Sequence, residues 1–320
     1  MVMTMDVKLM VVVLLLLLCS AVALQKCDED DEAALLAMSD ALGKPPYHSY
    51  DVGCDQDSGR VVSLSVFQDA NLTGAIPDAI ANLTHLRTLV LRHLPNLSGA
   101  IPDSLAALTG LSQLTISWTA VSGPVPSFLA GLTSLTLLDL SFNSLTGVIP
   151  ASLGALANLS AINLSRNRLA GAIPAGLFAN LQQQEAYLRL SHNNLSGSVP
   201  ADLAEVRLAV VDVSRNALSG DATAVLARAK YVDLSRNGFS FNMSGVVLAE
   251  EAYYVDVSHN GIRGGIPAQV ANLTGLRTFN VSYNRLCGAI PNMASSSFDA
   301  FCFHHNKCLC GAPLPTPCPP

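Results

Sequence analysis

The sequence has 320 residues, half of them hydrophobic and 13% charged, with a formal net charge of -6. An acidic chain without a basic stripe has nothing to neutralise phosphates, which argues against a nucleic-acid partner. The length allows either one long repeat array or two compact domains.

The N-terminal residues have the pattern of a secretory signal peptide. Lys8 precedes an apolar run at 9–18, and residues 21–23 (Ala-Val-Ala) have the small-x-small form of a cleavage site. The run is much shorter than the roughly 20 residues that a membrane-spanning helix needs. We therefore expect residues 1–23 to be removed and the mature chain to be secreted and not membrane-spanning.

Residues 24–60 are assigned to an N-terminal cap. Within them, residues 28–42 predict a helix whose acidic first turn suits the positive end of the helix dipole. Cys27 and Cys54 flank this helix, and in an oxidising compartment we expect them to form a disulfide. For the acidic run, a solvated helix start is the simpler interpretation, and a calcium or partner site is the alternative.

Variants of one segment recur along residues 61–291. Each carries an aliphatic residue or Phe five and three residues before a marker position, an alternation that predicts a short strand. The marker is an asparagine in seven segments: Asn143, Asn167, Asn193, Asn216, Asn237, Asn260 and Asn284. Three earlier segments keep the strand but lack the asparagine. The asparagine spacing of 21 to 26 residues is the period of leucine-rich repeats, of which we count about ten.

The repeats predict an α/β solenoid, in the form of a right-handed leucine-rich-repeat superhelix with a concave parallel β-sheet and disulfide caps at both ends. Several strands are followed by Gly-x-Ile-Pro, in which glycine permits a turn, as at Gly99 and Gly171. This version of the repeat resembles the plant extracellular class. We expect the marker asparagines to be structural, because a buried amide can bond the backbone of adjacent coils.

Nine Asn-x-Ser/Thr sequons fit a secreted chain. We expect glycosylation at seven of them: Asn71, Asn82, Asn96, Asn158, Asn194, Asn242 and Asn272. Asn163 and Asn280 lie mid-strand on the expected concave face, where a glycan would block binding. We expect these two to be used least.

The last repeat and the C-terminal cap, residues 292–320, hold five cysteines: Cys287, Cys302, Cys308, Cys310 and Cys318. With Cys27 and Cys54 they make an odd number after removal of the signal peptide, so at least one is unpaired or pairs between chains. His304 and His305 lie among these cysteines, but the spacing fits no common zinc pattern, and a secreted chain favours disulfides. We therefore expect no metal and no cofactor.

Two segments near the C-terminus carry a family resemblance: residues 280–291 (NVSYNRLCGAIP) and 306–315 (NKCLCGAPLP). With about ten repeats and irregular coils around Gly220 and Phe241, the chain resembles the polygalacturonase-inhibiting proteins. The resemblance implies a curved solenoid that binds and inhibits fungal endopolygalacturonases. It also implies a role in defence, in the extracellular space of the plant cell wall, the apoplast.

The same resemblance implies disulfides between Cys287 and Cys308 and between Cys310 and Cys318, which leaves Cys302 as an extra thiol. The chain departs from the family at the N-terminal cap. Members usually have an adjacent cysteine pair and a tryptophan there, and residues 44–53 have neither.

In each repeat strand the two aliphatic side chains point inward, so the residues between and beside them face the concave side. Stacked coils turn each such position into a column with about 4.8 Å between rungs. The column between the aliphatics contains Asp139, Asp212, Asp233 and Asp256. We expect this row of carboxylates to resemble polygalacturonate and to engage the basic cleft of the enzyme. The alternative is that these aspartates are common repeat residues whose charge nearby arginines compensate.

The column beside the marker asparagines is basic and aromatic. Its candidate partner-binding residues are Trp118, Phe142, Arg166, His192, Arg215, Arg236 and His259. Tryptophan, tyrosine and arginine are the side chains most enriched at interface anchors. Trp118 is the only tryptophan of the chain, and its exposed strand position indicates a partner.

Three other functions stay open. Neighbouring aspartates would meet the carboxylate spacing of a glycosidase, about 5 to 9.5 Å. A flat solvated face, however, gives no burial to raise one acid's pKa, so we expect the protein not to be an enzyme. The chain could instead be a secreted module that binds a peptide or a receptor ectodomain in signalling or development. It could also bind pectin directly through the Arg and His column.

Overall fold

The computed structural model describes residues 27–43, 50–181, 184–292 and 298–319. The expected signal peptide, residues 1–23, lies outside these ranges. No helix within them is long and apolar enough to cross a membrane. The chain forms two compact units, Met1–Leu145 and Thr146–Pro320.

A helix opens the first unit. Helix α2 (Glu29–Ala41) begins at Asp28, whose carboxylate accepts the backbone N–H of Asp30 at 3.0 Å. The helix buries Ala34 and Met38. Strand β1 (Tyr50–Cys54) follows and pairs antiparallel with β2 (Val61–Phe67), so the cap continues into the first coil.

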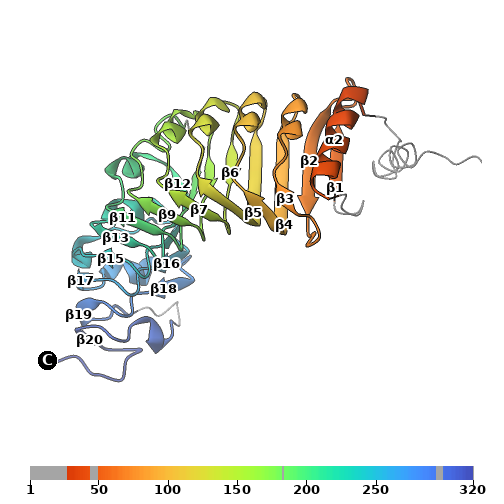
Figure 1. The fold of residues 1–320 in the computed structure, drawn as a ribbon. Helices are drawn as coiled ribbons and strands as arrows, with labels where there is room; N and C mark the ends of the chain where they lie inside the picture. The colour runs from red at the N-terminus through yellow and green to blue at the C-terminus, as the bar shows by residue number, and fades with distance from the viewer. Residues whose placement is uncertain (1–26, 44–49, 182–183, 293–297, 320) are drawn as a thin grey trace, which may run out of the picture. The chain divides into compact units, whose positions relative to one another are not determined.

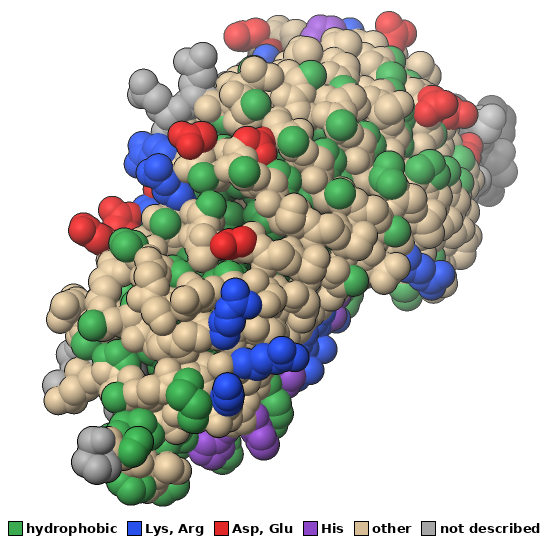
Figure 2. Space-filling view, turned by 90° about the vertical axis from the view of Figure 1, so that its left-hand side faces the viewer, with side chains coloured by type: hydrophobic (Ala, Val, Ile, Leu, Met, Phe, Trp, Pro, Cys, Tyr) green, Lys and Arg blue, Asp and Glu red, His purple; other side chains and the backbone are tan. Residues whose placement is uncertain are grey.

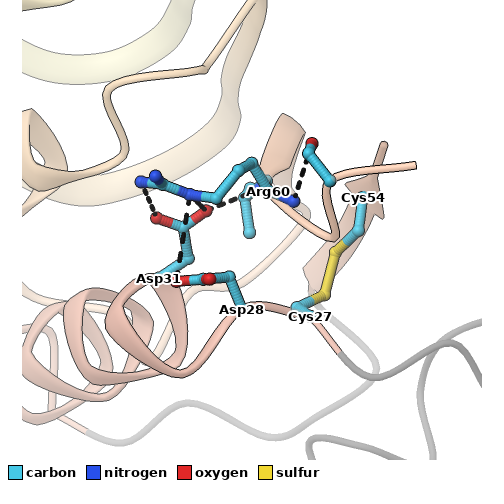
Figure 3. The surroundings of a disulfide bond; sticks show 7 residues. Cys27, Asp28, Asp31, Cys54 and Arg60 are labelled. Atoms are coloured by element: carbon cyan, nitrogen blue, oxygen red, sulfur yellow. Dashed lines mark hydrogen bonds and ion pairs between the residues drawn. A yellow bond between two sulfur atoms is a disulfide. The ribbon is translucent and has the colours of Figure 1, made fainter. Parts of the chain in front are cut away.

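A disulfide and a buried ion pair hold the cap together (Figure 3). Cys27 and Cys54 form the disulfide. Arg60 donates from Nη2 to Asp31 Oδ1 at 2.7 Å, and Asp31 is 1% exposed. Burial would raise the pKa of Asp31, but Arg60 and the backbone N–H of Val61 outweigh it and hold that pKa below its usual range. The interpretation of the acidic run as a solvated helix start is therefore wrong for Asp31.

The coils of the first unit stack as parallel strands. Strand β2 pairs with β4 (Thr88–Gly99), β4 with β5 (Gln113–Pro124), and β5 with β6 (Leu137–Asp139), while β3 (Gly74–Ala75) also pairs with β4. One buried leucine from each coil lies in register in this sheet: Leu64, Leu89, Leu114 and Leu138. Short 3₁₀ helices return each chain segment to the next strand: η2 (Asp78–Asn82), η3 (Asp103–Ala107) and η4 (Ser127–Gly131).

The second unit repeats this arrangement. Its main parallel sheet contains β8 (Ala161–Asn163), β10 (Ala186–Arg189), β12 (Leu208–Asp212), β14 (Tyr231–Asp233), β16 (Tyr254–Asp256) and β18 (Thr278–Asn280). The inward residue of each strand is buried and in register: Ile162, Leu188, Val211, Val232, Val255 and Phe279. Each coil therefore contributes one rung to a continuous apolar core.

Short strands that follow the main strands form further parallel pairs. They are β9 (Arg168–Gly171), β11 (Asn194–Gly197), β13 (Ala217–Gly220), β15 (Gly238–Phe239), β17 (Arg263–Gly264), β19 (Arg285–Ala289) and β20 (Cys308–Cys310), while β7 (Ser144–Gly147) spans the boundary of the two units. Gly171, at the end of β9, has a φ of 79° and a Cβ there would approach Val148 Cγ1 to 3.0 Å. That position therefore needs glycine for both conformation and space.

The connecting helices of the second unit are short, and they lie on the side away from the main strands (Figure 1). They are η5 (Ala151–Ala155), η6 (Ala201–Glu205), α3 (Thr223–Leu226), η7 (Met243–Gly245) and η8 (Ala268–Asn272). Helix η9 (Ala300–Cys302) instead lies beside β18, because the Val281 N–H donates to Cys302 O at 2.9 Å. Both units are thus leucine-rich-repeat solenoids, as the sequence predicts.

The marker asparagines join successive coils. Asn216, for example, donates from Nδ2 to Leu190 O and Val213 O at 3.0 Å and accepts the Leu195 N–H at 3.0 Å. The structural role expected for these amides is confirmed. Asn306, which the repeat count leaves out, continues the ladder by donating to Val281 O at 3.0 Å.

The C-terminal cap contains two disulfides, Cys287–Cys308 and Cys310–Cys318. These are the same pairs as the family resemblance implies. Cys302 has a free thiol of intermediate exposure. Disulfides therefore lie near both ends of the described chain.

Candidate functional site

The main sheet of the second unit brings three of the four predicted aspartates together. Asp212 is in register with Asp233, and Asp233 with Asp256. Asn280 follows on the next rung. Asp139 occupies the equivalent position of its own coil in the first unit, in register with Thr115.

Each aspartate of this column closes a local turn. Its Oδ1 atom accepts the backbone N–H of the serine two residues later: Ser214 at 3.1 Å, Ser235 at 2.9 Å and Ser258 at 2.9 Å. Two asparagines of the same column, Asn163 and Asn280, make the same bond to Ser165 and Ser282 at 3.2 and 3.1 Å. The turn therefore needs an acceptor oxygen and does not need a charge.

No arginine neutralises these carboxylates directly. Among the described residues, no ion pair involves Asp212, Asp233 or Asp256. Burial, followed by the charges of Asp212 and Asp256, raises the pKa of Asp233 to about 6 although Ser235 donates two hydrogen bonds to it. The expectation that this face gives no burial to raise an acid's pKa is therefore wrong. A charge at Asp233 costs folding free energy.

The basic and aromatic column has an unusual backbone. In the first unit Gln68, His93, Trp118 and Phe142 have φ between 55° and 58°. In the second unit the members are Arg166, His192, Arg215, Arg236, His259, Tyr283 and His305, with φ between 53° and 56°. Glycine adopts this left-handed region freely, and asparagine, aspartate and histidine are enriched there among the other residues. The glutamine, arginine, tryptophan, phenylalanine and tyrosine side chains of the column therefore cost backbone energy, and the sequence signal for the conformation is their place directly before the marker position.

Aromatic rings stack along this column in the first unit. Trp118 lies parallel to Phe142 with ring centroids 3.6 Å apart, and His93 is 5.1 Å from Trp118. Trp118 is 43% exposed in spite of these contacts. The predicted pair of Trp118 and Phe142 is thus brought together as a flat, solvent-facing surface.

In the second unit the column contains three arginines, three histidines and one tyrosine. Burial and then the charge of Arg166 lower the pKa of His192, while burial and then Arg236 lower that of His259. The Nδ1 atoms of both histidines are buried without a hydrogen-bond partner in the described structure. Figure 2 shows Lys or Arg side chains next to histidines in its lower part, which holds the C-terminal coils.

A third column was missed by the sequence reasoning. Tyr231 and Tyr254 lie in register two residues before Asp233 and Asp256, and their rings stack with centroids 4.2 Å apart. The guanidinium of Arg189 lies 5.9 Å from the Tyr231 ring centroid. The repeated Tyr-Val-Asp of these two strands was the available signal. The acidic column is therefore bordered by aromatic rings on one side and by the basic column on the other.

The sequons divide by exposure. The seven expected to carry glycans are all exposed, whereas Asn163 and Asn280 are only partly exposed. The Asn280 amide also donates to Asp256 Oδ2 at 3.0 Å. Within the described residues no group of three or more His, Cys, Asp or Glu could hold a metal ion.

Sequence comparisons identify similar proteins. Models of the leucine-rich repeat match residues 125–169 and 186–206. Polygalacturonase inhibitor 2 of Arabidopsis thaliana is 54% identical over 56 residues, 17% of this chain and 17% of that protein. A polygalacturonase inhibitor of Vitis vinifera is 42% identical over 122 residues, 35% of this chain and 36% of that protein. The alignments thus span well under half of either inhibitor.

Structural comparisons extend over more of the chain. A plant ice-binding protein is 42% identical, with a TM-score of 0.85 over 92% of this chain and 99% of that one. The plant peptide hormone receptor RGFR1, in complex with RGF2, is 32% identical, with a TM-score of 0.60 over 73% of this chain and 42% of that one.

Proposed function

The chain belongs to the polygalacturonase-inhibitor-like family of plant leucine-rich-repeat proteins, and from this premise we propose that it is a secreted defence protein that binds and inhibits fungal endopolygalacturonases. The contact is made by the acidic column Asp212, Asp233 and Asp256 and its two flanking columns. Trp118 and Phe142 supply an aromatic anchor in the first unit. The protein acts as a binding partner and not as a catalyst.

The observation that carries this proposal is that the fold does not require the negative charges. Asn163 and Asn280 make the same turn as the aspartates. At Asp233 the charge opposes folding, because burial and two neighbouring carboxylates raise its pKa. The charge of Asp233 lowers the stability of the fold, and its presence on this face therefore indicates a binding role. An enzyme that binds polygalacturonate must offer cations to a polyanion, so a row of carboxylates is complementary to its cleft.

The left-handed column supports the same surface. Its residues would be cheapest as glycine or asparagine, yet they are arginine, histidine and aromatic side chains. Arginine, tryptophan and tyrosine are the residues enriched at binding hot spots. The carboxylate at Asp233 and the large side chains at positive φ both lower the stability of the fold, and they lie on neighbouring columns of one sheet. Together they favour a protein partner.

The test is a titration of the secreted, glycosylated protein against a panel of fungal endopolygalacturonases, following reducing ends released from polygalacturonate. The triple variant is Asp212→Asn, Asp233→Asn, Asp256→Asn, which keeps the turn oxygen and removes the charge; it also carries Ser214→Ala, Ser235→Ala and Ser258→Ala, because each new asparagine would otherwise begin an Asn-x-Ser sequon. The matched controls are the three serine changes alone and Asp221→Asn with Thr223→Ala, because Asp221 accepts the Thr223 N–H at 2.7 Å in a similar turn outside the column.

We expect the wild type to inhibit some enzymes of the panel, the triple variant to inhibit about tenfold less or weaker, and the controls to behave as wild type. Equal inhibition by the triple variant would reject the acidic column as the contact. Absence of inhibition by every enzyme would favour the peptide or receptor-ectodomain partner, with which the similarity to RGFR1 is consistent.

A control without added enzyme addresses catalysis. A carboxyl with raised pKa beside two other carboxylates is also a feature of glycosidases. Release of reducing ends by the protein alone would therefore overturn the non-catalytic assignment. Direct pectin binding through the basic column predicts retention on polygalacturonate that falls steeply with salt, unlike a packed protein interface.

Ice binding is a second candidate, favoured by the similarity to the ice-binding protein over nearly all of that chain. Small exposed hydroxyls recur beside the turn glycines, as at Ser98 in the first unit and at Ser196 and Ser219 in the second. Inhibition of ice recrystallisation by the wild type at micromolar concentration would support it. An unchanged grain size relative to albumin would reject it.

A further inference from the structure

The last coil of the second unit presents an aromatic surface. Tyr283 and His305 stack with ring centroids 4.1 Å apart, and Phe301 meets His304 edge to face at 5.3 Å. We call these four residues the C-terminal aromatic platform. Phe301 is 73% exposed, more than any other large hydrophobic side chain in the described chain, and Tyr283 is 46% exposed. These exposed fractions are large for aromatic side chains, and contacts among the described residues do not explain them.

The platform lines a shallow hollow. Its volume is about 360 Å³, and Asn280, Ser282 and Cys302 complete its wall. This volume is near the lower end of the range for ligand sites, about 300 to 1,000 Å³. Flat aromatic faces therefore meet polar groups in a space of the size of a small ligand.

We propose that this hollow binds a neutral hexopyranose ring of a glycan, at the end of the acidic column where Asn280 follows Asp256. One face of such a ring carries C–H groups that pack on aromatic rings, whose faces are electron-rich. The hydroxyl groups at the ring edge can bond imidazole nitrogens and the amide of Asn280. Tyr283 stacked on His305 provides the wider face, and Phe301 provides the second one.

The charges around the hollow select against an anionic sugar. No lysine or arginine lines it. Burial, followed by the charges of Asp299 and Asp256, raises the pKa of the Cys302 thiol in its wall. The same negative potential disfavours a uronate carboxylate. A neutral hexose is therefore the sugar class that fits, and pectin fragments are not.

Cys302 offers a local reporter of occupancy. The other described cysteines are in disulfides, so iodoacetamide applied at mildly alkaline pH alkylates this thiol. The rate is measured on the full secreted protein with cellohexaose, chitohexaose or trigalacturonate present. Cellohexaose and chitohexaose distinguish a plant-type from a fungal-type glycan of the same chemistry, and calorimetry gives the affinity of each.

We expect at least one neutral hexaose to slow alkylation about fivefold and trigalacturonate to leave it unchanged. Phe301→Ala and Tyr283→Asn, the latter compatible with a positive φ, should each weaken the calorimetric affinity about fivefold or more. Tyr253→Ala is the matched control, because Tyr253 is 42% exposed in the same unit and does not line the hollow. The control should bind as wild type.

Lack of protection by both neutral hexaoses would overturn the proposal, as would stronger protection by trigalacturonate. Binding that is unaffected by Phe301→Ala would place the sugar elsewhere and overturn it as well. Endopolygalacturonase inhibition is also measured on Phe301→Ala, which lies outside the three columns, and should not change. Loss of inhibition in Phe301→Ala without any glycan binding would instead make the platform a protein contact.

Discussion

Asp233 accepts the backbone N–H of Ser235 at 2.9 Å, although burial and two neighbouring carboxylates raise its pKa to about 6. The native state therefore holds this proton more tightly than the unfolded chain, whose aspartate pKa is about 3.9. Stability is greatest below about pH 4 for this group, falls as pH rises through that window, and is lowest above about pH 6.

Asp233→Asn, made together with Ser235→Ala so that no Asn-Leu-Ser sequon arises, should accordingly stabilise the protein relative to Ser235→Ala alone. The asparagine keeps the acceptor oxygen and can donate to a neighbouring carboxylate, as Asn280 does to Asp256. We expect a gain of about 1 to 3 kcal/mol at pH 7 that shrinks toward pH 4, together with weaker inhibition. Urea unfolding at both pH values measures this. A destabilised variant at pH 7 would contradict the account of the acidic column.

The ion pair of Asp31 and Arg60 gives the opposite pH dependence. The folded pKa of Asp31 is lowered, so its contribution is present above the unfolded pKa and is lost as pH falls through the lower, folded value. Asp31→Asn should lower the free energy of unfolding by about 2 kcal/mol at pH 7. This is a small value for a broken buried ion pair, because Arg60 is partly exposed. Asp30→Asn, an exposed neighbour, should change stability little. Equal effects of the two variants in thermal unfolding would reject the buried pair.

A substitution at Trp118 separates the effect of backbone strain at this position from the effect of contact between the ring and the enzyme. Trp118→Asn removes the ring that stacks on Phe142 but suits a φ of 56°. We expect inhibition to weaken about tenfold or more while the unfolding midpoint moves little, because the ring is exposed. Val247→Ala, which removes a more exposed apolar side chain outside the columns, should leave inhibition unchanged. A normal inhibition constant for Trp118→Asn would remove this residue from the interface.

The glycan map follows from burial. Asn280 uses its amide to bind Asp256, and Asn163 lies within strand β8, so both should be occupied least. The seven exposed sequons should carry glycans in the secreted protein. Peptide mapping by mass spectrometry measures occupancy, and full occupancy of both strand positions would contradict the concave-face assignment.

Periodicity explains which features were predictable. The strands, the marker asparagines and the columns follow from spacing along the chain, because every coil repeats the same local bonds. The raised pKa of Asp233, the buried pair of Asp31 with Arg60 and the stacked Tyr231 and Tyr254 depend on through-space distances that spacing does not give. Asn306 escaped the count although Phe301 and Phe303 stand five and three residues before it and its amide bonds are those of the other markers; its coil forms helix η9 (Ala300–Cys302) where the others form a strand.

Asn306 provides a test of how far the solenoid extends. It donates to Val281 O and Phe303 O at 3.0 and 2.9 Å and accepts the Leu286 N–H at 3.0 Å. Asn306→Ala would remove these bonds from the Leu286 N–H and from Phe303 O, at about 1 to 3 kcal/mol for each group that water does not reach, whereas Val281 O keeps the bond from the Asn284 amide at 3.1 Å. Because coils contact only their neighbours, the cost should appear as local opening of the last coils and less as a lower global stability. Hydrogen exchange at Leu286 should therefore accelerate in Asn306→Ala and stay slow in Asn194→Ala, which changes an exposed residue next to a ladder position. Unchanged exchange in both variants would mean that the ladder ends energetically at Asn284.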